Sequence, residues 1–168
     1  HFFGALGTEV TIIHRRGVML REEDEDVALR FTEVYQRRFN MVLDAVVTAV
    51  SHLEGEFKVA VTTPDRDRSI TSDTPLMATG RVPITDTLEV VKSGVRLNQR
   101  GYIDIDGFLQ TNVLGIWALG DIVGRFLLKH SANLGVAYAS NNILDPENRV
   151  AVDYPAVPHA VFASPQVA

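Results

Sequence analysis

The chain has 168 residues, of which 46% are hydrophobic and 22% are charged, and its formal net charge is −5. This composition is typical of a globular protein and excludes a disordered or collagen-like chain. The acidic balance argues against a nucleic-acid-binding surface, and the lack of cysteine excludes disulfides, zinc thiolates and cysteine catalysis within the chain.

The sequence shows neither a membrane span nor an export signal. No apolar run approaches the ~18 residues that a membrane span requires. The N-terminal HFFGALGTEV lacks the basic region and the cleavage pattern of a signal peptide. We therefore expect a soluble, cytoplasmic protein that binds neither membranes nor nucleic acid.

The first elements in chain order are an α/β unit. Residues 1–6 read as the end of a helix, and Gly7 occupies the position of a left-handed helix terminator. Residues 10–13, VTII, predict a short parallel strand buried on both faces. Because the chain starts and stops without the usual end signals, we expect it to be a segment of a longer protein.

An amphipathic helix is predicted next. Five acidic residues at 22–26 suit the start of a helix, and Arg30, Arg37 and Arg38 suit its end, in agreement with the helix dipole. The apolar face is expected to consist of Val27, Phe31, Val34 and Tyr35. We interpret the acidic run as solvated helix start rather than a metal site.

The rest of the chain alternates short strands and loops. An apolar period of two predicts an antiparallel meander of strands at 42–51, 56–63 and 67–71, followed by a buried strand at 74–80. Later elements are a hairpin around 98–101, a buried strand at 115–119 and a helix at about 130–143. The predicted fold class is therefore α/β.

An arginine cluster follows the VTII strand. Ligands of open α/β sheets bind beyond the carboxyl ends of the strands, where Arg15 and Arg16 are expected, with Arg21 close behind. Guanidinium groups suit a doubly charged 2′-phosphate, which favours NADPH over NADH. A solvated basic loop would have the same sequence, so the pattern alone leaves both readings open.

Two further segments carry candidate ligand-binding residues. Gly120 and Asp121 end the run GIWALGD, where a carboxylate next to a glycine could bind ligand hydroxyls or merely cap a turn. The free amides at the start of the following helix could face a developing negative charge. Gly80 and Arg81, in ATGRVP, could form a charged junction or an ordinary turn. The five histidines have no ligand spacing, so we expect no metal.

These motifs occur in an informative order. FFGALGTEVTIIHRR, the acidic helix start, ATGRVP, the hairpin, GIWALGD and VPHAVFASPQVA together resemble the flavoprotein disulfide reductases, the pyridine nucleotide-disulfide oxidoreductase family. The run GRFLLKHSAN after ALGD looks most like the mycothione-reducing members. The resemblance covers essentially the whole chain and implies a Rossmann-like nucleotide-binding domain with a β-meander, followed by part of an FAD-binding domain.

The resemblance also implies domain limits and residue roles. Residues 1–81 would be the later part of the NAD(P)H-binding domain, 82–152 the returning FAD segment, and 153–168 the start of the dimerisation domain of a homodimer. The residues that the resemblance assigns to cofactor binding would contact NADPH or FAD, and none of them would be catalytic. They are Arg15, Arg16, Arg21, Gly80, Arg81, Gly120, Asp121, Lys129 and His130.

The departures from the family pattern set the expected activity. The glycine-rich phosphate loops, the paired redox cysteines and the acid/base pair of the family are not in this sequence. We therefore expect the chain alone to be inactive and its parent to reduce a small-molecule disulfide, such as mycothione. Alternatives are a dihydrolipoamide dehydrogenase or mercuric reductase-like enzyme, a non-catalytic nucleotide-binding module, and a structural relic that binds neither cofactor.

Overall fold

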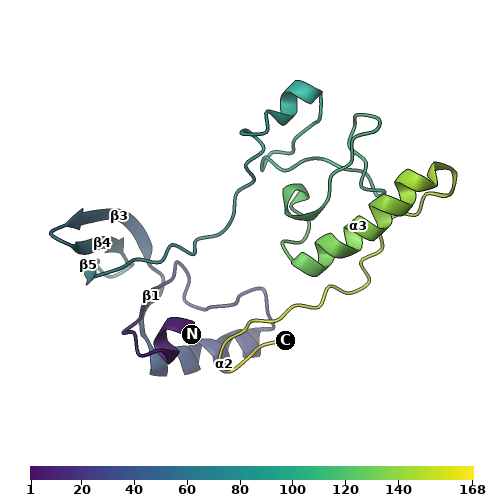
Figure 1. Ribbon diagram of the computed structural model, residues 1–168. Helices are drawn as coiled ribbons and strands as arrows, with labels where there is room; N and C mark the ends of the chain where they lie inside the picture. Colours follow the sequence, from purple (N-terminus) through teal and green to yellow (C-terminus); the bar gives the residue numbers. More distant parts are fainter. The chain divides into compact units, whose positions relative to one another are not determined.

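The computed structural model describes residues 1–168, which divide into two compact units. The first consists of His1–Ala78 together with Ala160–Ala168, and the second of Thr79–His159. Figure 1 follows the elements of each unit along the chain.

The first unit contains a β-α-β arrangement. Helix α1 (Phe2–Ala5) ends before Gly7, whose φ of 92° is left-handed, as predicted. Strands β1 (Thr11–Ile13) and β2 (Asn40–Val42) are parallel, with Ile12 opposite Met41, and α2 (Glu25–Arg38) connects them. The predicted α/β unit is therefore confirmed.

The prediction that β1 is buried on both faces is wrong. Thr11 is exposed, and Ile12 and Ile13 are only half-buried. The physical reason is that β1 pairs along one edge only, in a sheet of two strands. Its side chains still serve two cores, because Ile12 packs against α2 and Ile13 packs against the following meander.

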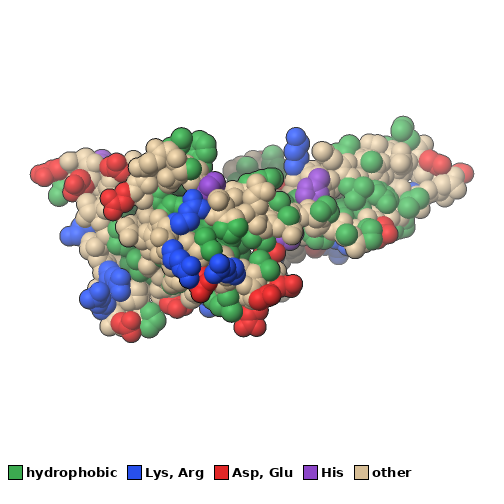
Figure 2. All heavy atoms as spheres, turned by 90° about the horizontal axis from the view of Figure 1, so that it is seen from below, with side chains coloured by type: hydrophobic (Ala, Val, Ile, Leu, Met, Phe, Trp, Pro, Cys, Tyr) green, Lys and Arg blue, Asp and Glu red, His purple; other side chains and the backbone are tan.

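Helix α2 is amphipathic, as the sequence indicates. Its buried face includes Phe31 and Tyr35, whose rings stack with their centroids 4.2 Å apart. Both rings pack against Ala163 from the C-terminal segment. The predicted Val27 and Val34 are half-buried, while Ala28 and Thr32 are buried in their place. Figure 2 shows acidic and basic side chains intermixed on the exposed surface over α2. The acidic start and basic end of α2 are thus solvated.

A three-stranded antiparallel meander follows β2. Its strands are β3 (Val46–Leu53), β4 (Glu56–Thr62) and β5 (Asp67–Ser72), in the order β3-β4-β5. Val59 and Val61 of the central strand form its core with Ala45. The predicted strand at 42–51 is divided between β2 and β3, because Asp44 has a left-handed φ of 49° that interrupts extended backbone.

The predicted buried strand at 74–80 is wrong. These residues have no strand partner, and Leu76 and Met77 are 74% and 80% exposed. An apolar run becomes a strand only when its backbone groups find a neighbouring ladder, and no other strand of this chain supplies one.

The second unit is built mainly from turns around helix α3. A single bridge joins Leu97 and Ile103 in the predicted hairpin, and Asn98 closes its turn by donating to the Tyr102 carbonyl. The predicted buried strand at 115–119 is wrong: only the bridge between Gln110 and Trp117 forms, and of that segment only Ala118 is buried. A single bridge does not make a strand here, because the residues on both sides of it form turns.

The one helix that the sequence predicts in this unit is confirmed. Helix α3 (Lys129–Leu144) covers the predicted 130–143. Three short 3₁₀ turns complete the unit, η1 (Val90–Ser93), η2 (Gly120–Val123) and η3 (Pro146–Asn148). Leu109, Ala139 and Val152 form the core beneath α3.

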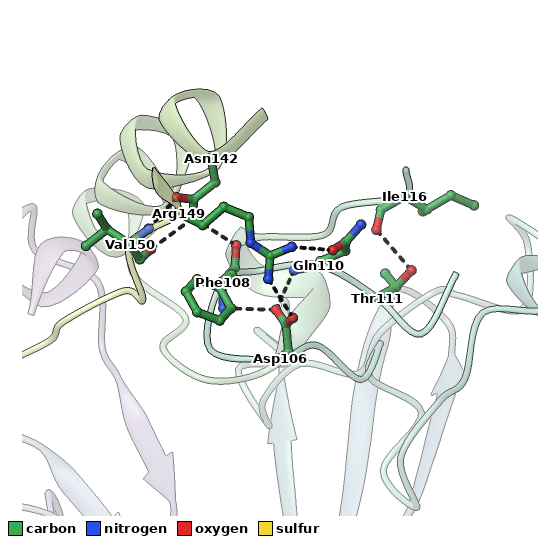
Figure 3. A network of polar contacts seen from close by, with 8 residues as sticks. All are labelled: Asp106, Phe108, Gln110, Thr111, Ile116, Asn142, Arg149 and Val150. Carbon is green, nitrogen blue, oxygen red and sulfur yellow. Dashed lines mark hydrogen bonds and ion pairs between the residues drawn. The ribbon is translucent and has the colours of Figure 1, made fainter. Parts of the chain in front are cut away.

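A polar network fixes the C-terminal half of α3 (Figure 3). Asn142, 1% exposed, donates to the carbonyls of Phe108 and Val150 at 3.3 and 2.9 Å and accepts from the Val150 amide at 2.8 Å. Arg149 lies 4.3 Å over the Phe108 ring and donates to Gln110 Oε1 at 2.8 Å. The loop before the GIWALGD run and the chain after α3 are therefore joined through side chains.

None of the helices is both long and apolar enough to cross a membrane.

Candidate functional site

The loop after β1 and the connection after β2 meet at the carboxyl edge of the parallel strands. The His14 amide donates to the Val42 carbonyl at 2.9 Å, which extends the ladder beyond β1. Beyond it, the Ala45 amide donates to the His14 carbonyl at 3.0 Å and the Asp44 amide to the Arg16 carbonyl at 3.2 Å. This is the edge at which open α/β sheets bind ligands.

Arg15 and Arg16 lie on that loop and are exposed. The loop backbone is closed by the His14 ring, whose Nδ1 lies 3.0 Å from the Arg16 carbonyl oxygen and 3.4 Å from the Arg16 amide. Neither arginine takes part in any of the ion pairs of the structure. The arrangement leaves two cationic forks facing solvent at a ligand-binding edge, where they can bind an anionic group.

Arg21 differs from the other two arginines. Its Nε lies 3.5 Å from the Glu22 carboxylate, and both side chains are largely exposed. No hydrogen bond or ion pair joins Arg21 to Arg15 or Arg16. Its charge is partly balanced by its neighbour, so its role in binding an anion stays a prediction.

In the second unit, the structure brings together residues that lie 40 positions apart in the sequence. Arg81 Nη1 donates to Asp121 Oδ2 at 2.8 Å and approaches the Leu127 carbonyl at 3.4 Å. Gly80, just before Arg81, has a left-handed φ of 120°. The ion pair is more than half exposed, so its contribution to stability is small, but it holds ATGRVP beside GIWALGD.

Gly120 and Asp121 begin η2, which packs against the first half of α3. Gly120 has a φ of 75°, and a Cβ built on it would lie 3.4 Å from Ala132. This close approach brings Asp121 to the beginning of α3. Arg81 occupies one Asp121 oxygen and leaves Oδ1 able to accept from a ligand hydroxyl.

The start of α3 has no side-chain cap. Leu128 is the N-cap, and Lys129 and His130 in the first turn are exposed. The free amides and the positive end of the helix dipole therefore face outward beside η2, where they favour a negative charge. Ser131 is buried, and its Oγ has no hydrogen-bond partner. The cluster of Gly80, Arg81, Gly120, Asp121, Lys129 and His130 is thus gathered in one unit.

Sequence reasoning missed two residues at these sites. Asp44 hydrogen-bonds through its amide to the arginine loop, and Gly124 ends η2 with a φ of 67° directly against the Tyr102 ring. A polar residue just after the apolar run that became β2 was the available signal for Asp44. Nothing in the local sequence indicated the contact between Gly124 and Tyr102.

No group of three or more His, Cys, Asp or Glu side chains in the structure could hold a metal ion. The two clusters instead offer guanidinium groups, helix amides and a carboxylate. Those groups bind phosphates and hydroxyls, which are the polar groups of dinucleotides.

Comparison with known proteins gives consistent matches. The family described as "Pyridine nucleotide-disulphide oxidoreductase" matches residues 1–141. Mycothione reductase from Mycobacterium tuberculosis is 33% identical over 172 residues, which covers 100% of this chain and 37% of the relative. Dihydrolipoyl dehydrogenase from Haemophilus influenzae is 30% identical over 166 residues, covering 99% of this chain and 34% of the relative.

Among solved structures, the flavoprotein disulfide reductase RclA from Escherichia coli superposes with a TM-score of 0.82 at 28% identity. The match covers 98% of this chain and 36% of that protein. The predicted α/β fold class is therefore confirmed. The chain spans a little over a third of the length of the relatives that it matches.

Proposed function

Because the chain belongs to the pyridine nucleotide-disulphide oxidoreductase family, we propose that it supplies nucleotide-binding surfaces to an NADPH-dependent flavoprotein that reduces a small disulfide. The observation that carries the choice of NADPH is the position of Arg15 and Arg16. They lie exposed at the carboxyl edge of the parallel strands and outside every ion pair.

The arginine loop would hold the adenosine end of NADPH. A 2′-phosphate is doubly charged near neutral pH, and planar guanidinium forks match its oxygens in geometry and charge. Arg15 and Arg16 would make the main contacts, and Arg21 would add positive potential. A free 2′-hydroxyl, as in NADH, would gain little from these side chains.

The cluster in the second unit would hold FAD. Asp121 Oδ1 would accept hydrogen bonds from ribitol hydroxyls, and Arg81 would keep that carboxylate in place. Gly80 and Gly120 allow the backbone turns that bring these side chains to the ligand. The amides of Lys129 and His130 would face the flavin ring, where the bound flavin supplies the redox chemistry.

This proposal includes a division into domains. Residues 1–81 would belong to the NAD(P)H-binding domain, 82–152 to the FAD-binding domain and 153–168 to a dimerisation domain. The two compact units support a change of domain near residue 80, since the first unit passes to the second between Ala78 and Thr79. The full-length protein would be a cytoplasmic homodimer.

The substrate would be a small disulfide, and mycothione is the one we propose first because mycothione reductase is 33% identical across the whole chain. A dihydrolipoyl dehydrogenase is the second candidate, favoured by 30% identity to that enzyme. Arg15 and Arg16 argue for NADPH and therefore for the first. A mercuric reductase-like enzyme is a further alternative.

Activity would require groups beyond this chain. Disulfide reduction in this scheme passes electrons through a pair of cysteines, and the sequence has none. The 168-residue chain alone is expected to be inactive, which makes a non-catalytic nucleotide-binding module the alternative for the isolated polypeptide. Reduction of its flavin by NADPH, followed by absorbance, would contradict this expectation.

Steady-state kinetics of the full-length protein test the cofactor assignment. R15Q/R16Q should raise KM for NADPH by about tenfold or more and leave KM for NADH within about twofold. R66Q/R68Q is the matched control, since it removes two exposed arginines from the meander turn and β5 of the same unit. Equal losses with both cofactors, or an equal effect of the control, would refute the 2′-phosphate assignment.

A further inference from the structure

A carboxylate lies directly beside the arginine loop. Asp44 follows β2 with a left-handed φ of 49°, and its amide donates to the Arg16 carbonyl at 3.2 Å. Its side chain lies over Gly17: a Cβ built on Gly17 would be 2.9 Å from Asp44 Oδ2 and 3.5 Å from Oδ1. The carboxylate therefore occupies the space that a side chain at position 17 would fill.

The charge of this carboxylate is not balanced by a defined partner. Asp44 is exposed and takes part in none of the ion pairs, and its amide is bonded to the backbone of Arg16 in the facing loop. Its backbone is held by a hydrogen bond to the residue whose guanidinium would bind phosphate. A negative charge is thus placed at the edge where a second, larger negative charge would bind.

We propose that Asp44 is a specificity-determining residue that weakens binding of the 2′-phosphate by charge repulsion and so limits the preference for NADPH over NADH. The inference rests on the proposed function, because it requires the phosphate to bind at Arg15 and Arg16. Repulsion between a carboxylate and a phosphate dianion at ~8 Å in water changes affinity by about fivefold. A nucleotide without the 2′-phosphate lacks that charge and is little affected.

Two substitutions separate the charge of Asp44 from the position of its side chain. D44N removes the charge, and asparagine tolerates the left-handed backbone at this position. G17A keeps the charge but places a methyl group where the carboxylate lies, and the flexible Asp44 side chain must move away. The backbone of Gly17 is not left-handed, so alanine is compatible with it.

Isothermal titration of the full-length protein with 2′,5′-ADP and with 5′-AMP tests the inference. D44N should lower the dissociation constant of 2′,5′-ADP about threefold to tenfold at low salt and leave that of 5′-AMP within about twofold. This gain in affinity should shrink at ~0.5 M salt, which a purely structural effect would not do. G17A should also lower the dissociation constant of 2′,5′-ADP, by a smaller factor.

The outcomes distinguish the two proposals. If the wild-type protein binds 2′,5′-ADP no more tightly than 5′-AMP, the 2′-phosphate assignment fails and the inference fails with it. If the wild type prefers 2′,5′-ADP but D44N leaves that preference unchanged or lowers it, only the role of Asp44 is overturned. An unchanged preference in G17A would show that the carboxylate does not act from its position over Gly17.

Discussion

Asn142 offers a test of how the second unit holds helix α3 in place. N142A removes the three hydrogen bonds that join α3 to the Phe108 and Val150 backbone. At roughly 1 kcal/mol each, and with polar groups left unpaired, the free energy of unfolding should fall by about 2–4 kcal/mol. N142D should cost at least as much at neutral pH, because it turns a carboxylate oxygen toward two carbonyls.

The neighbouring asparagine is a matched control. Asn141 is exposed and its side chain makes no hydrogen bond, so N141A should change stability by less than about 0.6 kcal/mol and in the favourable direction, since alanine is the better helix former. Urea unfolding of the full-length protein, followed by circular dichroism, measures both variants. Equal effects of N142A and N141A would refute the role of the network.

The remaining predictions concern the proposed FAD-binding unit. G124A adds a Cβ 2.5–2.7 Å from three Tyr102 ring atoms at a φ of 67°, whereas G115A meets no atom within 4 Å at a φ of 82°. Because both share the backbone strain, urea unfolding should find G124A less stable than G115A by about 1–3 kcal/mol, and equal stability would disprove the clash. R81A should lower the FAD content of the purified protein, measured by absorbance, at least about threefold through loss of the contact that positions the carboxylate. R96A, which removes an exposed arginine of the same unit, should retain its flavin, and undiminished flavin in R81A would contradict the assignment.

Local patterns in the sequence predicted the elements that depend on local physics. The dipole-matched charges of α2, the left-handed Gly7 and the three antiparallel strands of the meander are all present in the structure. Prediction failed where apolar runs were read as buried strands. Leu76 and Met77 are exposed, because burial depends on what packs against a run as well as on its composition.

At the candidate sites, too, the sequence predicted the local motifs but not the contacts between distant residues. The family and its cofactor classes, FAD and NAD(P)H, were predicted from ordered motifs and agree with the family match. The pairing of Arg81 with Asp121 could not be predicted, because 40 residues separate them and the contact depends on the turns between. The contact of Asp44 with Gly17 likewise requires the parallel pairing of β1 and β2.

The most direct measurement is the position of the 2′-phosphate in a crystal structure of the full-length protein with NADPH bound. We predict that its oxygens lie within hydrogen-bonding distance of the Arg15 and Arg16 guanidinium groups. A phosphate held by other residues, with both arginines directed away from it, would contradict the central claim.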